Sequence, residues 1–336
     1  MADSADAQTT VIFVLHYLKE KLSIYAACTA VGFCACAFAS LAQSALPESK
    51  LYVAAPKFDT AFASWPVEGG KPEAAVLSIH GFGLHKGAFD SFAKRLARAG
   101  IVTYAIDVRG FGSWTDTVGP RGEVNFYQTL MDVRTALYWV KTMHPGVPMF
   151  LLGESMGGAI ALQATALFPD SVNGLIASVP GDDFYGENKA RFKVALGMML
   201  PNARMDMSGQ VIERATSKDS VQNSWKQDPQ SRLKFSAREI TAFNAFMKKS
   251  HELARSITEK PVLMFQGGLD RLSKPDGTVK LFRELPTADK DLVVLGDSEH
   301  LIFEKGQFDE HVIEVVSSWI HKHSRKASQA NTAMPR

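Results

Sequence analysis

The residues that most clearly indicate catalytic chemistry are Gly153-Glu154-Ser155-Met156-Gly157, which lie between a strand-like apolar run and a helix-like one. A serine on a sharp strand-to-helix turn has a strained backbone, so its neighbours must be small, and the flanking glycines meet that need. Such a turn exposes the hydroxyl at a helix N-terminus, where the dipole stabilises developing negative charge. The pattern predicts that Ser155 is a nucleophile; a glycine-rich turn with an incidental serine is the alternative.

A nucleophilic serine needs a base, and the base needs a carboxylate that fixes its tautomer. His300 is the expected base because it follows the last predicted strand by one short loop. Asp270 is the expected carboxylate because it follows another predicted strand in the same way. Asp297 and Glu299 lie nearer to His300 in the sequence, but neighbours on one short loop rarely point at the same ring nitrogen. We therefore predict a triad of Ser155, Asp270 and His300.

A second turn, His80-Gly81-Phe82-Gly83, also follows a predicted strand. Its glycines allow the backbone N–H groups to turn toward the nucleophile. The N–H groups of Phe82 and Met156 are the expected oxyanion hole, which holds the negative oxygen of a tetrahedral intermediate. We expect His80 to be structural, because it precedes this loop.

The triad requires strands that end at one edge of a sheet, and the hydropathy pattern predicts them. Short buried strands are expected at Ala74–Ile79, Ile101–Ile106, Pro148–Leu152, Val172–Ser178, Pro261–Gln266 and Asp291–Leu295. Amphipathic runs between them predict helices. The expected fold class is therefore α/β, with a mostly parallel, doubly wound sheet. Residues 48–180 and 256–323 would form this core.

The interval 181–255 has no strand candidate and is predicted to be a helical insertion, or lid, over the carboxyl ends of the strands. Apolar residues recur at helical spacing just before Pro201, and we expect them to bind substrate: Phe192, Leu196, Met199 and Leu200. Ligands of α/β sheets bind at that edge, which favours an acyl-chain channel. A helix packed on the core is the alternative. The polar tail, 324–336, is predicted to be disordered.

The N-terminal segment, 1–47, has no charged residue between Lys21 and Glu48. The apolar stretch 22–47 is long enough to span a bilayer as a helix, and basic residues precede it. It predicts a membrane anchor or a secretory signal, with the catalytic domain anchored or exported. A cytoplasmic location and a helix packed on the core remain alternatives.

The composition is that of an ordinary globular protein, with 46% hydrophobic residues, 21% charged residues and a net charge of +2. No basic patch predicts a nucleic-acid partner. The three cysteines, at positions 28, 34 and 36, all precede the predicted core, so no disulfide is expected within it. No metal-ligand or phosphate-binding motif occurs, and we expect neither a metal nor a cofactor.

The chain from about residue 59 to 319 resembles the monoacylglycerol lipase and lysophospholipase (serine aminopeptidase-like) branch of the α/β-hydrolase superfamily. The matching pieces are His80–Gly83, Asp107–Gly112, Gly153–Gly157, Gly268–Asp270 and Glu299–His300. The order serine, aspartate, histidine is that of the superfamily. The resemblance implies that Asp107 and Arg109 organise the loops behind the nucleophile, and that the insertion is a lid that admits acyl chains.

The expected function is hydrolysis of a lipid-like ester of the monoacylglycerol or lysophospholipid type, through an acyl-enzyme. The branch also includes aminopeptidases and acyltransferases, and fold alone does not select among them. An aminopeptidase would need lid carboxylates to hold a substrate ammonium, and Asp182, Asp183 and Glu187 could supply them. A non-catalytic ligand-binding receptor is a further alternative; its usual mark is a damaged triad, whereas this triad is complete.

Overall fold

The computed structural model describes residues 62–115, 122–185 and 203–333. The predicted N-terminal segment, 1–47, therefore lies outside the described residues, as do Phe192, Leu196, Met199 and Leu200. Within the described ranges, no helix has the length and apolar character needed to cross a bilayer.

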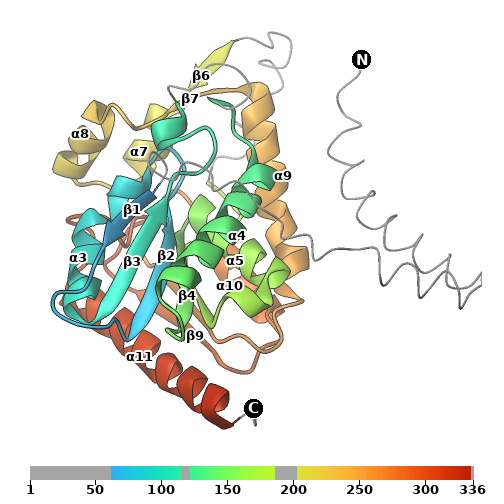
Figure 1. Cartoon of the computed structure of the whole chain (residues 1–336). Helices are drawn as coiled ribbons and strands as arrows, with labels where there is room; N and C mark the ends of the chain where they lie inside the picture. The colour runs from blue at the N-terminus through green and yellow to red at the C-terminus, as the bar shows by residue number, and fades with distance from the viewer. Residues whose placement is uncertain (1–61, 116–121, 186–202, 334–336) are drawn as a thin grey trace, which may run out of the picture. The chain divides into compact units, whose positions relative to one another are not determined.

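Seven strands form one sheet in the order β1-β3-β2-β4-β5-β8-β9 (Figure 1). Their bounds are β1 Phe62–Trp65, β2 Ala74–Ile79, β3 Ile101–Ile106, β4 Met149–Glu154, β5 Gly174–Ser178, β8 Val262–Gly267 and β9 Lys290–Leu295. Every neighbouring pair is parallel except β1 with β3. The six predicted strands are present, and the predicted α/β-hydrolase sheet is confirmed. β1 has no counterpart among the predicted strands.

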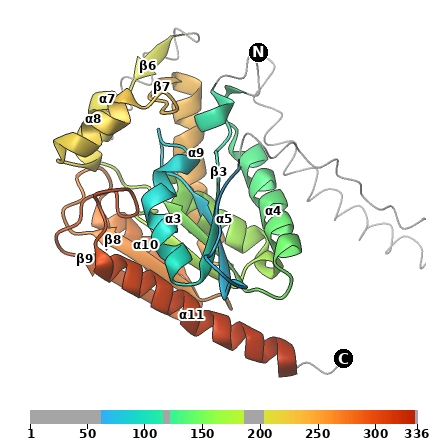
Figure 2. The ribbon, with the colours of Figure 1, turned by 60° about the vertical axis from the view of Figure 1, so that its left-hand side comes forward.

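Helices cover both faces of the sheet (Figures 1 and 2). One face packs against α3 (Asp90–Arg98) and α11 (Glu310–Ala333). The other packs against α4 (Phe126–Met143), α5 (Met156–Leu167), α9 (Ala237–Ala254) and α10 (Pro275–Glu284). Residues of β2 alternate between the two cores, and the whole strand is buried. Burial on both sides explains why the central strands read as continuous apolar runs.

The segment between β5 and β8 is not purely helical, so the prediction that it holds no strand is wrong. It contains α7 (Ser208–Ala215), α8 (Asp219–Gln227) and an antiparallel pair, β6 (Arg204–Asp206) and β7 (Lys234–Ser236). Each strand of this pair has three residues, and only the central one is apolar: Met205 pairs with Phe235. So short a run, flanked by charged residues, gives no readable period of two.

The C-terminal tail is also more ordered than predicted. α11 continues to Ala333, through most of the stretch expected to be disordered (Figure 2). His323 and Lys326 both contact Asp289, at 3.3 and 3.0 Å, and the hydroxyl of Ser324 donates to the Ile320 carbonyl. Polar composition gave the wrong prediction here, because His323 and Lys326 hold the helix to the segment before β9.

Short 3₁₀ turns among the described residues include η3 (Lys86–Phe89), η4 (Gly112–Trp114) and η6 (Pro169–Ser171).

Glycines allow α5 to pack directly on the backbone of the sheet, beside the turn that bears Ser155. A Cβ on Gly157 would lie 1.9 Å from the carbonyl oxygen of Ile79, and one on Gly153 would lie 2.1 Å from that of Gly157. No side chain fits at such distances. These glycines are therefore needed for the close approach of β4, α5 and β2, which places the turn at the edge of the sheet.

Candidate active site

Ser155, His300 and Asp270 form one chain of hydrogen bonds at the carboxyl edge of the sheet. Ser155 lies between β4 and α5 with φ = 53°, the strained left-handed backbone that the turn predicts. Its Oγ is 2.9 Å from Nε2 of His300, and Nδ1 of His300 is 2.8 Å from Oδ2 of Asp270. Because a carboxylate can only accept, Nδ1 carries the proton and Nε2 is free to accept the serine proton. The geometry is that of an activated nucleophile.

The backbone after β8 holds Asp270 in place. Its Oδ1 accepts hydrogen bonds from the backbone N–H of Leu272 and of Ser273, at 2.8 and 2.9 Å. Its Oδ2 faces His300 and also lies 3.3 Å from Nε2 of Gln266. Each oxygen of this buried carboxylate thus has two hydrogen-bond partners. These contacts fix the orientation of the carboxylate and, through it, of the His300 ring.

Neither rival carboxylate contacts the imidazole. Asp297 is exposed on the loop before His300. Glu299 turns the other way, where it accepts from the hydroxyl of Thr216 and the backbone N–H of Ser217, both at 2.8 Å. Glu299 thereby joins this loop to the segment after α7, a role that sequence position alone does not reveal.

The electrostatics of the chain suit a general base. Burial by itself lowers the pKa of His300, but the charge of Asp270 and its hydrogen bond raise that pKa above 6.5. Burial raises the pKa of Asp270, but the charge and hydrogen bond of His300 keep it below its ordinary value. Each group therefore favours the charged form of the other, so a proton taken from Ser155 is stabilised on His300.

The loop that follows β2 lies against the nucleophile. His80 is buried; its Nδ1–H donates to the carbonyl of Gly81 at 2.8 Å, and its Nε2 accepts from the N–H of Val108 at 3.0 Å. Burial lowers the pKa of His80 to about 4, so its ring is neutral and structural, as expected. A Cβ on Gly81 would lie 3.7 Å from Cβ of Ser155. The Phe82 and Met156 amides border the same turn; their role as oxyanion hole stays a prediction.

α8 and the segment after it also hold this loop, which sequence reasoning missed. The carbonyl of Gly83 accepts from the N–H of Arg232 at 3.1 Å and from the indole N–H of Trp225 at 3.3 Å. The buried guanidinium of Arg232 donates to the carbonyl of Gly110 and pairs with Glu239, both at 2.6 Å. Gly83 and Trp225 are 142 residues apart, so no local pattern signals the contact.

Asp107 and Arg109, which the resemblance assigns to organising the loops, each contact a neighbouring element. The buried carboxylate of Asp107 accepts from the N–H of Lys86 at 2.8 Å and of Ser113 at 3.0 Å. Arg109 makes a two-pronged pair with Asp132, at 2.6 and 2.8 Å. These contacts tie the loop after β3 to the loop after β2 and to α4. Among the described residues, no group of His, Cys, Asp or Glu side chains is arranged to hold a metal ion.

Comparison with known proteins places this site in a family. Residues 70–306 match the family model described as serine aminopeptidase, S33. This range covers most of the chain and includes Ser155, Asp270 and His300. The chain belongs to the S33 family.

Two proteins similar to this chain are named monoglyceride lipases. The protein from Rattus norvegicus is 31% identical over 262 residues, which cover 75% of this chain and 83% of the relative. The protein from Homo sapiens is 29% identical over 275 residues, covering 79% and 87%. A solved structure, a soluble variant of monoglyceride lipase from Saccharomyces cerevisiae in complex with a substrate analog, has a TM-score of 0.68 and 26% identity. It covers 78% of this chain and 91% of that chain.

Two of the three carboxylates that could hold an ammonium in this S33 member are paired with basic side chains. Asp182 lies 2.8 Å from Nε2 of His251, and Asp183 lies 2.7 Å from Nζ of Lys274. Glu187 lies outside the described residues. The two described aspartates therefore interact with basic side chains of the chain itself.

Titration of the histidines tests the electrostatics of the site. We expect the NMR titration midpoint of His300 to lie above 6.5, and that of His80 near 4. Asp270→Asn removes the charge that raises the pKa of His300 but leaves its burial unchanged, so the midpoint should fall. Asp297→Asn is the matched control and should leave the midpoint in place. An unchanged midpoint in Asp270→Asn would contradict the assignment of Asp270.

Proposed function

We propose that this chain is a carboxylic-ester hydrolase that acts on lipid-like esters with one acyl chain, with monoacylglycerol the first candidate. The observation that carries the proposal is the hydrogen-bonded chain from Ser155 through His300 to Asp270. The chemistry of such an arrangement is acyl transfer through a covalent serine ester. The relatives named monoglyceride lipase support a lipid-like ester as the substrate.

In the proposed mechanism, Oγ of Ser155 attacks the ester carbonyl while Nε2 of His300 takes the serine proton. Asp270 stabilises the imidazolium without taking its proton. The N–H groups of Phe82 and Met156 would hold the tetrahedral oxyanion. Collapse breaks the bond to the alcohol, which leaves with the proton from His300. Water then attacks the acyl-enzyme, gives its proton to His300 and releases the fatty acid as Ser155 regains its proton.

The alternatives have less support. An aminopeptidase needs a free carboxylate for the substrate ammonium, and Asp182 and Asp183 are both engaged. An acyltransferase would share every step up to the acyl-enzyme and differ only in the acceptor that replaces water. A non-catalytic receptor has no need of an intact hydrogen-bonded triad.

Substrate access is part of the proposal. We assign residues 181–255 as a lid over the core formed by 48–180 and 256–323. Its contacts with the acyl chain would come from Phe192, Leu196, Met199 and Leu200, which recur at helical spacing. The apolar stretch 22–47 would bring the enzyme to a membrane surface, where single-chain lipids reside.

Variants of the triad test the proposed function. Ser155→Ala should reduce monoacylglycerol hydrolysis by several orders of magnitude, since the residual rate of such sites comes from binding and the oxyanion hole alone. Asp270→Asn should be similarly severe because it favours the wrong imidazole tautomer. Asp297→Asn, on the neighbouring loop, should retain nearly full activity. Steady-state hydrolysis with p-nitrophenyl esters, monoacylglycerol, lysophospholipid and aminoacyl anilides measures all three. Preference for the anilides, or an active Ser155→Ala, would refute the proposal.

A double variant tests the acyl-chain contacts. Each buried methylene is worth about 0.8 kcal/mol, so kcat/KM should rise roughly fourfold per added carbon until the channel is full. Leu196→Ser with Leu200→Ser should flatten this dependence and change acetate esters little. The matched control is Leu167→Ser with Val294→Ser, because both side chains are exposed, at 46% and 60%. Equal losses for short and long esters, with lower thermal stability, would identify the stripe as core.

A further inference from the structure

Glu154, the last residue of β4, links the nucleophile turn to the loop that carries His300. Its side chain is completely buried. Oε1 accepts hydrogen bonds from the backbone N–H of Ile302 at 2.6 Å and of Phe303 at 3.1 Å. The residue before Ser155 thus holds the backbone just after His300. The contact joins residues that are 148 positions apart.

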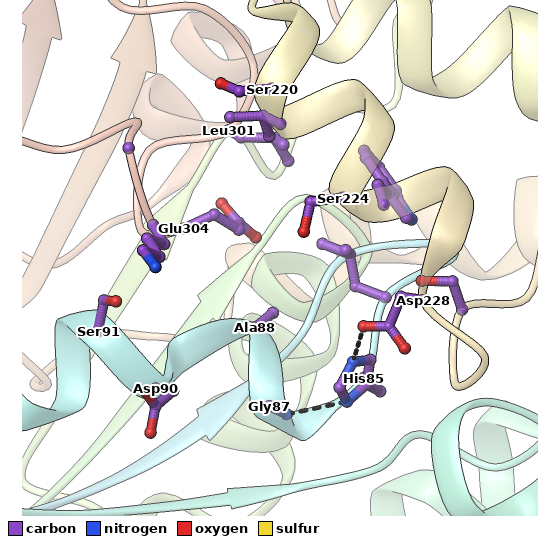
Figure 3. A pocket seen from close by; sticks show the side chains of 16 residues that line it. His85, Gly87, Ala88, Asp90, Ser91, Ser220, Ser224, Asp228, Leu301 and Glu304 are labelled. Atoms are coloured by element: carbon purple, nitrogen blue, oxygen red, sulfur yellow. Dashed lines mark hydrogen bonds and ion pairs between the residues drawn. The ribbon is translucent and has the colours of Figure 1, made fainter.

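A second buried carboxyl group, that of Glu304, lies on the same loop. Its side chain is only 6% exposed, yet neither of its oxygens has a hydrogen-bond partner among the described residues, and nor does Oε2 of Glu154. Glu304 borders a cavity of about 470 Å³ between η3, α8 and the loop after His300. Figure 3 shows its carboxyl projecting into the space between Leu301 and Ala88.

The carboxyl group of Glu304 is sensitive to that of Glu154. Burial is the largest cause that raises the pKa of Glu304 well above 4.5, and the charge of Glu154 raises it further. A proton on Glu304 removes the repulsion between two like charges at a buried position.

Other ionisable groups surround the pair. They are His300 on the same loop, Lys305 beside Glu304, and Asp90, His85 and Asp228 around the cavity. His85 is paired with Asp228 at 2.8 Å. The charge that raises the pKa of Glu304 is that of Glu154.

We propose that the Glu154–Glu304 carboxyl pair is a positioning device that fixes the loop bearing His300 against the strand that ends at Ser155. The inference rests on the proposed hydrolysis, because its purpose is the short contact between Oγ of Ser155 and Nε2 of His300. When Glu304 loses its proton, two buried carboxylates repel each other and the loop shifts away from the nucleophile. The pair therefore makes turnover decline as pH rises through the raised pKa of Glu304.

Variants of Glu154 test the positioning. Glu154→Ala leaves the N–H groups of Ile302 and Phe303 without an acceptor, and kcat should fall on the order of 100-fold because a small misplacement of His300 is costly. KM should change little, since the acyl channel is untouched. Glu154→Gln keeps an acceptor oxygen and should restore most of kcat. Asp297→Asn, which changes a surface carboxylate on the loop that bears His300, is the matched control. If the kcat of Glu154→Ala equals that of Asp297→Asn, the proposal is wrong.

Glu304→Gln tests the dependence on pH. A glutamine amide is neutral, as the protonated acid is, but it cannot ionise. The kcat of the native enzyme should fall as pH rises through the raised pKa of Glu304, whereas the kcat of Glu304→Gln should not fall over that interval. An equal fall of kcat in both enzymes would overturn the role assigned to Glu304.

Stability measurements give an answer that does not depend on catalysis. A raised pKa in the folded state stabilises the protein fully below the ordinary value of 4.5, and this stabilisation is lost as pH rises through the raised pKa. The Tm of the native protein should therefore fall relative to that of Glu304→Gln across this interval. If Tm changes with pH in the same way in the native protein and in Glu304→Gln, the proposed interaction of Glu154 with Glu304 is wrong. Absence of ester hydrolysis in the native protein would instead refute the proposed function, and leave the Tm comparison to decide the pair.

Discussion

The hydrogen bond from His300 to Asp270, 2.8 Å long and shielded from solvent, is the interaction on which the rest of the site depends. It sets the tautomer of the imidazole, and only that tautomer presents a free Nε2 to Ser155. The bond forms because β4, β8 and β9 are parallel and end at one edge of the sheet. The glycine contacts between α5 and β2 complete the arrangement, since they bring Ser155 to that edge.

The contrast between two buried histidines shows how strongly the partner decides the chemistry. His80 and His300 are both almost fully buried. The pKa of His80 is lowered to about 4, because burial outweighs the distant charge of Asp107. The pKa of His300 is raised, because Asp270 contacts its ring. One imidazole therefore serves as a neutral hydrogen-bonding spacer, and the other can hold a proton.

The sequence allowed the six parallel strands, the nucleophile turn and the two loops with Asp270 and His300 to be predicted, because each depends on a local pattern. The β6–β7 pair escaped prediction because three residues carry no period. The contacts from Arg232 to Gly83 and from Glu154 to Ile302 escaped because they join positions more than 140 residues apart. Local patterns thus predict the elements and the reacting groups, whereas the buried polar contacts that position those groups require the fold.

Covalent labelling with a fluorophosphonate tests most directly whether the hydrogen-bonded chain activates Ser155. Such a reagent reacts with a serine whose proton is removed by a neighbouring base. We predict a single phosphonyl adduct, located by mass spectrometry on Ser155, which forms rapidly in the native protein and very slowly in His300→Ala. An adduct on another residue, or equal labelling rates in the native protein and His300→Ala, would contradict the account.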